Sequence, residues 1–224
     1  ARHDVYFLAH HVAGADVPSG CTVIHIGRGE RTPRFGYGTD FIPLYGALRR
    51  VGPQVIYQRV ACGYTGICAW YARRHQSRMI WHVAHETDVM PESLDTGRNL
   101  LRRVLEKRSI EYGIRNADRI VVQTLDQAQL LERNYSRRAD RVVPNFQENA
   151  GETIDKSGVL TVVWIANLKP WKQPEVFLRL AQALGGLQAV RFVMVGEAPT
   201  DARSAGWVRG LLAQIDTLPN LEFI

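Results

Sequence analysis

Two lysines follow a predicted strand at a place where a phosphate group could bind. Residues 161–166 are apolar and β-branched, as in a buried strand, and Lys169 and Lys172 come shortly after them. Pro174 then begins a segment whose apolar side chains recur at helical spacing, namely Val176, Phe177, Leu180, Ala181 and Leu184. The first N–H groups of a helix lack internal partners and favour anions. The pattern indicates a phosphate site, and a solvated loop is the alternative.

The elements around these lysines form a strand, turn, helix and strand. Gly185 and Gly186 end the predicted helix, and residues 191–195 are the next apolar strand. In such a unit the start of the helix lies outside the carboxyl end of a parallel strand, where α/β sheets bind ligands. The predicted elements therefore position both lysines at a functional edge.

A histidine follows another predicted strand, residues 78–84. His85, Glu86 and Asp88 come directly after this strand, so His85 is a second candidate for a functional side chain. An ordinary polar loop remains the alternative. His82 lies three residues before His85, and on a strand the two side chains would point to opposite faces. They would be poor joint ligands, and we predict no metal site.

Composition and charge narrow the classes of partner. The formal charge of +6 over 224 residues favours anionic partners. The basic residues are not interleaved with aromatic ones, which argues against nucleic acid. No apolar run is long enough to span a membrane, and the three cysteines form no CxxC pair. We expect a cytoplasmic protein with reduced cysteines.

A basic segment dominates the middle of the chain. A helix is predicted over residues 92–116, with Leu101, Val104, Leu105 and Tyr112 facing inward. Residues 98–119 contain six arginines and one lysine against three acidic residues. A solvated helix face is the favoured interpretation. Peripheral contact with an anionic membrane is the alternative.

Strands and helices alternate along the chain, which predicts an α/β protein with mainly parallel sheets. Predicted strands are residues 4–11, 22–27, 54–58, 78–84, 119–123, 141–143, 161–166, 191–195 and 221–224. Predicted helices are residues 40–51, 65–75, 92–116, 125–133, 174–184 and 207–215. Thr124 to Gln127 resembles a capping box at the start of one of them. The polar segment 148–158 indicates a crossing between two domains, residues 1–147 and 159–224.

Four blocks, in order and over nearly the whole chain, resemble retaining GT-B glycosyltransferases of the glycosyltransferase group 1 family. They are ADRIVVQT (117–124), VVPNF (142–146), WIANLKPWKQP (164–174) and RFVMVGEAP (191–199). The resemblance implies a GT-B fold of two Rossmann-like domains. Residues 1–147 would be the acceptor-side domain without its first strand and helix. Residues 159–224 would begin an incomplete nucleotide-sugar-binding domain, whose donor-contacting pair of glutamates would lie beyond residue 224.

The resemblance also implies roles for individual residues. Lys172 stands at the position of the family's diphosphate-binding lysine, and Asn167 stands where the family has an arginine, so Lys169 would supply the missing charge. His85 corresponds to the histidine near the donor sugar. Gly196 and Glu197 correspond to the glycine turn near the nucleotide.

The implied activity is transfer of a sugar from a nucleotide-sugar donor to a sugar or lipid-linked acceptor, with retention of configuration. The implied context is the synthesis of surface polysaccharide or glycolipid at the inner face of the membrane. Neither a metal ion nor another cofactor is expected. Two alternatives stay open: a non-catalytic nucleotide-binding or scaffold module of the same fold, and a nucleotide-sugar epimerase.

Overall fold

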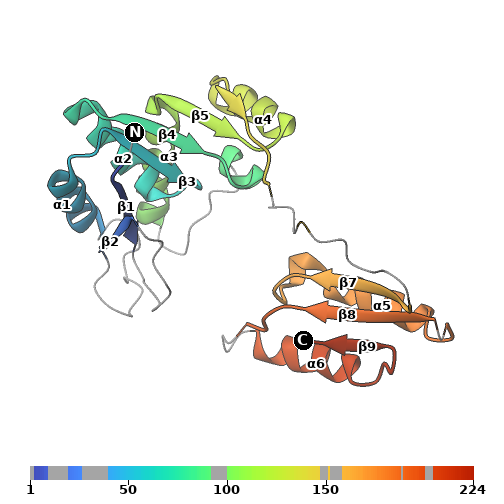
Figure 1. Cartoon of the computed structure of the whole chain (residues 1–224). Coiled ribbons are helices and arrows are strands. Elements are labelled where there is room, and N and C mark those ends of the chain that lie inside the picture. Colours follow the sequence, from blue (N-terminus) through green and yellow to red (C-terminus); the bar gives the residue numbers. More distant parts are fainter. Residues whose placement is uncertain are drawn as a thin grey trace. The chain divides into compact units, whose positions relative to one another are not determined.

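The chain forms two compact units, residues 1–148 and 149–224 (Figure 1). The computed structural model describes residues 3–9, 20–26, 40–91, 100–146, 151, 158–187, 189–199 and 204–224, with the backbone alone at 100–102. Of the predicted crossing at 148–158, only residues 151 and 158 are described. Within the described part, no helix has the length and apolar character needed to cross a membrane.

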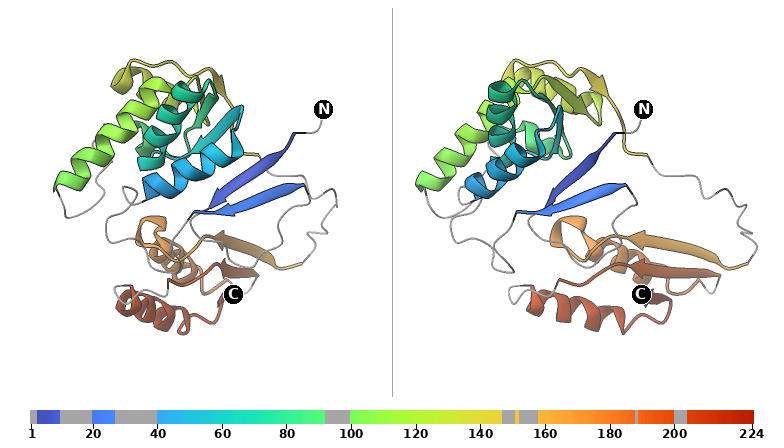
Figure 2. Two further views of the ribbon diagram at one scale, coloured as in Figure 1. Left: turned by 90° about the vertical axis from the view of Figure 1, so that its left-hand side faces the viewer. Right: turned by 60° about the vertical axis from the view of Figure 1, so that its left-hand side comes forward.

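The first unit contains a parallel sheet of four strands in the order β3-β4-β5-β6, which confirms the predicted α/β class. Its strands are β3 (Val55–Arg59), β4 (Arg78–His82), β5 (Arg119–Val122) and β6 (Arg141–Val142). The connections contain α2 (Gly63–His75), a short 3-10 helix η2 (Glu86–Val89), α3 (Leu100–Asn116) and α4 (Leu125–Tyr135). Strands β1 (Val5–Ala9) and β2 (Cys21–His25) pair separately, next to α1 (Phe41–Val51) (Figure 2).

Alternating side chains divide the four-stranded sheet into two faces. Met79 and Trp81 of β4 are completely buried, as are Ile120 and Val122 of β5, whereas the first residue of each strand is exposed. This period of two places the apolar side chains on the face that packs against the helices. Helices α2 and α3 approach so closely that a Cβ at Gly113 would lie 2.5 Å from the carbonyl carbon of Thr65.

The inward face of α3 differs from the prediction. Val104, Leu105 and Tyr112 are 40%, 57% and 37% exposed, and the side chain of Leu101 lies outside the described part. The buried positions are instead Glu106, Ile110, Gly113 and Ile114. The apolar residues of this helix do not form one stripe, so the close approach of α2 at Gly113 decides which side faces inward.

The predicted capping box at α4 forms with a changed partner. The Thr124 hydroxyl accepts a hydrogen bond from the N–H of Gln127 at 3.1 Å. The side-chain oxygen of Gln127 accepts from the N–H of Gln123 at 2.7 Å, one residue before the predicted partner. Both bonds still satisfy N–H groups around the start of the helix.

The second unit is a three-stranded parallel sheet in the order β7-β8-β9. Its elements are β7 (Leu160–Ile165), a 3-10 turn η4 (Pro170–Lys172), α5 (Pro174–Ala183), β8 (Val190–Val195), α6 (Ala205–Ile215) and β9 (Leu221–Phe223). In α5 the buried apolar residues are Phe177, Leu178 and Ala181, whereas Val176 and Leu180, which recur with them at helical spacing, are exposed. The reason is that Phe177 packs edge-on against Phe192 of β8, which turns that face of the helix to the sheet.

Candidate functional site

The turn between β7 and α5, residues 166–173 and called the lysine turn below, is anchored on both sides. Leu168 is fully buried in the core of the second unit, and its N–H donates to the carbonyl oxygen of Glu197 at 2.8 Å. The N–H of Ala166 donates to the carbonyl oxygen of Val195 at 3.0 Å. The carboxyl end of β8 therefore fixes the backbone that carries the two lysines.

The two cations lie on one short 3-10 turn. The N–H of Lys172 donates to the carbonyl oxygen of Lys169 at 2.9 Å. The Lys169 ammonium lies 5.0 Å from the ring centroid of Trp171, a cation–π contact, and Trp171 is 70% exposed. Within the described part, no ion pair joins either lysine to a carboxylate. The turn thus presents two positive charges that have no anionic partner in this part of the chain.

The start of α5 contributes less to anion binding than the sequence indicates. Gln173 has φ of 51° and makes no side-chain capping bond, and Pro174 has no N–H to offer a ligand. Glu175 already places a carboxylate in the first turn of the helix, where it accepts a bond from the Trp207 indole N–H at 2.7 Å. That carboxylate complements the helix dipole and repels a second anion. In the predicted phosphate site, the attraction for an anion would therefore come mainly from the lysine side chains.

Gly196 is required by packing. A Cβ at this position would lie 1.9 Å from the carbonyl oxygen of Ala166, well inside van der Waals contact. Its N–H donates to the carbonyl oxygen of Ile224 at 3.1 Å, and the carbonyl of Glu197 supports the lysine turn. The structure thus gives both residues a backbone role at the carboxyl edge of the sheet. Their contact with a nucleotide stays a prediction.

The other predicted site residues lie in different units. Asn167 is exposed in the lysine turn of the second unit. His85 belongs to the first unit, where it is exposed directly after β4. The backbone N–H of His85 donates to Asp88 at 3.1 Å, and Asp88 also accepts from the N–H groups of Ala61 and Ala84. The second unit therefore brings together Asn167, Lys169, Lys172, Gly196 and Glu197. His85 belongs to the other unit, where the carboxylate of Asp88 holds its backbone.

Sequence reasoning missed a group of polar side chains at the carboxyl edge of the first unit's sheet. We call it the edge cluster, and it consists of Tyr57, Arg59, His82, Gln123 and Asn145. The Tyr57 hydroxyl hydrogen-bonds Nδ1 of His82. Arg59 donates to Asn145 at 3.4 Å, and Asn145 donates to Gln123 at 3.2 Å. Burial lowers the pKa of His82, and the charge of Arg59 lowers it further, so the imidazole is neutral at pH 7.

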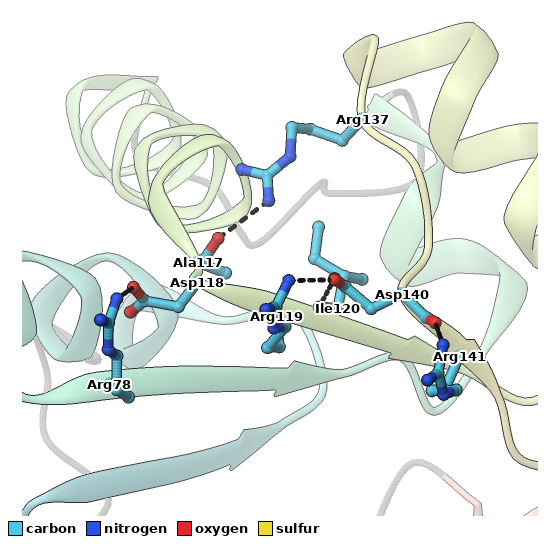
Figure 3. Close-up of polar contacts among 8 residues, drawn as sticks. All are labelled: Arg78, Ala117, Asp118, Arg119, Ile120, Arg137, Asp140 and Arg141. Atoms are coloured by element: carbon cyan, nitrogen blue, oxygen red, sulfur yellow. Dashed lines mark hydrogen bonds and ion pairs between the residues drawn. The ribbon is translucent and has the colours of Figure 1, made fainter.

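The polar contacts at the opposite, amino-terminal edge of this sheet are structural (Figure 3). Asp118 accepts from Arg78 at 3.0 Å and from the N–H of Met79 at 2.8 Å. Asp140 repeats the arrangement one strand later, accepting from Arg119 and from the N–H of Ile120, each at 2.8 Å.

Arg137 completes this edge at the end of α3. Its guanidinium donates to the carbonyl oxygens of Ala117 at 2.8 Å and Ile114 at 3.2 Å. The last carbonyls of a helix have no internal partners, so this bond caps α3. Arg137 is therefore committed to the fold, although the sequence shows it only as one of many basic residues.

Neither metal ligands nor reactive thiols stand out in the described part. No group of three or more histidine, cysteine or acidic side chains there is close enough to hold a metal ion. The three cysteines are free thiols. Burial raises the pKa of Cys68 to about 12, and it also raises the pKa of Cys62. Neither of these two thiols is a nucleophile at neutral pH.

Comparison with solved structures identifies the architecture. The structure superposes on Anabaena HepE in complex with UDP-glucose with a TM-score of 0.61 and 14% identity, covering 91% of this chain and 55% of HepE. The chain has a GT-B-like fold. The Staphylococcus aureus protein TarM, as a mutant in complex with fondaparinux, α-GlcNAc-glycerol and UDP, matches at a TM-score of 0.53 and 13% identity over 82% of this chain and 36% of TarM.

The fold is shared by more than one activity. A UDP-N-acetylglucosamine 2-epimerase matches at a TM-score of 0.52 and 12% identity, over 91% of this chain and 53% of the epimerase. No protein-family model and no curated protein sequence matches the chain. The GT-B-like chain spans about half the length of HepE and of the epimerase, and at these identities the likeness shows the fold alone.

Proposed function

We propose that this chain is part of a retaining glycosyltransferase that resembles the group 1 family and uses a nucleotide-sugar donor. The observation that carries the proposal is the lysine turn. It presents Lys169 and Lys172 at the carboxyl end of a parallel strand, without a carboxylate partner in the described part. HepE and TarM, which share the fold, were solved in complex with UDP-glucose and UDP.

The chemistry of sugar transfer explains why fixed cations matter. As the bond between the anomeric carbon and the diphosphate breaks, negative charge builds up on the diphosphate. Cations held in place by the fold stabilise this transition state more than the ground state. Lys172 would make the main contact and Lys169 would supplement it. In this scheme the lysines carry the neutralising charge, and no metal ion is required.

The remaining parts of the proposal concern the donor sugar and the acceptor. His85 would orient the donor sugar. The acceptor would be a sugar or a lipid-linked sugar in the synthesis of surface polysaccharide or glycolipid. Such an enzyme would work in the cytoplasm at the inner face of the membrane, where the basic helix α3 could contact anionic lipid.

The lysine turn is tested by calorimetric titration of the full chain with UDP-glucose. Lys172→Ala should weaken binding by about 1.5 to 3 kcal/mol, roughly tenfold to a hundredfold, because it removes a charge-assisted contact. Lys107→Ala is the matched control, since Lys107 is an exposed lysine of α3 in the other unit. Equal affinity in Lys172→Ala and the control would refute the site.

Product analysis then separates the activities that this fold supports. The complete protein that contains this chain is incubated with UDP-glucose or UDP-N-acetylglucosamine together with candidate sugar acceptors. A new glycoside with retained configuration supports the transferase, and an epimerised UDP-sugar would point to the epimerase. Tight binding without either product would favour a binding module.

A further inference from the structure

The edge cluster lies on one face and at one edge of the four-stranded sheet. In the parallel register Tyr57 and Arg59 of β3 share a face with His82 of β4, because Arg59 pairs with His82. His82 pairs with Val121, so Gln123, two residues on, continues the same face beyond β5. The carboxyl edge of a parallel sheet is where α/β folds bind ligands. The cluster therefore occupies the carboxyl edge of the sheet, after which His85 follows β4, and it uses side chains to which no role has been assigned.

Two nitrogen atoms of the cluster are buried without a hydrogen-bond partner in the described part. One is the side-chain amide nitrogen of Gln123, a residue only 8% exposed, and the other is Nε2 of His82. A buried amide N–H that makes no bond costs about 1 to 3 kcal/mol, so it calls for a ligand. The Gln123 oxygen is already taken by Asn145, which leaves its N–H as the free group.

The positive charge of Arg59 has no carboxylate partner in the described part. Its one described side-chain bond is the long contact of 3.4 Å to Asn145, and it forms no ion pair in the described part. The nearby carboxylate of Asp88 is occupied by three backbone N–H groups. Arg59 is exposed, so water can solvate its guanidinium and could also satisfy the free N–H of Gln123, but only an anion would in addition pair with the positive charge. An anion would satisfy both.

The backbone beside Arg59 is held in an uncommon conformation. Val60 has φ of 72°, which is unfavourable for a β-branched residue. Its carbonyl oxygen accepts bonds from the side chains of Gln58 at 2.8 Å, Trp81 at 3.2 Å and Thr65 at 3.3 Å. Several side chains thus enforce a strained residue at the end of β3, and strain of this kind is concentrated at functional sites.

We propose that the edge cluster binds an anionic group, a carboxylate or a phosphate, carried by the sugar acceptor. Arg59 supplies the charge and the amide of Gln123 supplies a hydrogen bond. The ring of Tyr57 is 59% exposed beside them and offers an apolar face to a sugar ring. Assigning the anion to the acceptor rests on the proposed transferase function, whereas anion binding by the cluster does not.

The test follows the imidazole signal of His82 by NMR in the full chain carrying Lys169→Ala and Lys172→Ala, so that the lysine turn does not compete. Inorganic phosphate, glucuronate and glucose are titrated separately, and the signal is assigned by its loss in His82→Asn. We expect phosphate or glucuronate to shift the signal saturably, and glucose not to do so. Arg59→Gln should weaken binding by about tenfold or more, because it removes the positive charge of the cluster.

The controls separate a bound anion from a structural effect. Arg108→Gln, an exposed arginine of α3, should change the affinity by less than about twofold. Arg59→Lys should restore part of the affinity. Preference for phosphate would indicate a phosphorylated acceptor, and preference for glucuronate an acidic sugar. No shift with either anion, or equal binding by Arg59→Gln, would overturn the proposal. Failure of the chain with both lysines intact to bind UDP-glucose would refute the proposed function without affecting this result.

Discussion

At the scale of single residues, Lys169 and Asn167 determine how much charge the lysine turn can offer. Lys169 is attracted to the exposed ring of Trp171, which holds its ammonium close to the turn. Asn167 is exposed two residues earlier, at the position where the group 1 family that the sequence resembles has an arginine. A turn with two lysines and an asparagine can match the family's charge only if Lys169 replaces that arginine.

This replacement predicts a rescue. Lys169→Ala should weaken UDP-glucose binding by about 1 to 2 kcal/mol, and adding Asn167→Arg should recover part of the loss, because a cation returns to the same turn. Calorimetry on the two variants measures both effects. Arg179→Ala, an exposed cation of α5, serves as the control. If Asn167→Arg recovers nothing, the two positions are not equivalent.

Gly196 gives a second prediction at this scale. Gly196→Ala should lower the free energy of unfolding of the second unit by about 2 to 4 kcal/mol, since the new Cβ would overlap the Ala166 carbonyl and push the lysine turn from β8. Gly206→Ala in α6 is the matched control, because nothing lies within 4 Å of its added Cβ. That change should stabilise by about 0.5 to 1 kcal/mol, as alanine favours the helix. Urea unfolding, followed by tryptophan fluorescence, measures the stability of both variants. An equal change in the free energy of unfolding in Gly196→Ala and Gly206→Ala would show that the close contact at Gly196 is unimportant.

At the scale of the elements, the ion pairs Arg78–Asp118 and Arg119–Asp140 connect neighbouring strands of the sheet. Burial alone would raise the pKa of Asp118, but the N–H of Met79 and the guanidinium groups of Arg78 and Arg119 outweigh it and lower the pKa. Burial would likewise raise the pKa of Asp140. The N–H of Ile120 and the charges of Arg119 and Arg137 outweigh this effect and lower the pKa. Each carboxylate thus ties the strand after it to the strand before it.

The sign of these shifts predicts a pH dependence. The two carboxylates stabilise the fold completely above the ordinary aspartate pKa of about 4. This stabilisation is lost as the pH falls through their lowered pKa values in the folded protein. Asp118→Asn should cost about 1 to 2 kcal/mol near pH 7, and this cost should shrink as the pH falls below about 4. Urea unfolding at several pH values measures it. The lowered pKa of His82 adds a separate loss below about pH 6.5, but it is common to both proteins and cancels in the difference. A cost independent of pH would contradict the assignment.

At the scale of the whole molecule, the boundary between two compact units with separate cores falls in the polar segment 148–158. Limited proteolysis should cut within 148–158 before it cuts within 160–195, because backbone in a packed sheet is protected. Mass spectrometry of the first fragments gives the position. Earlier cleavage inside the second unit would show that this unit is the less stable one and would refute the boundary.

Where the local pattern of apolar residues agrees with the packing, the sequence was sufficient to predict the structure. Leu44, Ala47 and Leu48 form a single buried stripe on α1, the helix predicted over residues 40–51. The lysine turn was also predictable, because strand, turn and helix are adjacent in the chain. The basic helix α3 has no single apolar stripe, so its buried face depends on the partner that reaches it.

The sequence by itself determined the alternation of strands and helices and the position of Lys169 and Lys172, because both follow from neighbours within a few residues. Only the tertiary structure decided that Arg59, His82, Gln123 and Asn145 lie together, since they come from four different strand ends. It likewise decided that Gly196 faces the Ala166 carbonyl, a contact across 30 residues of chain. Periodicity reports which face a side chain takes, but the register between strands sets which side chains meet.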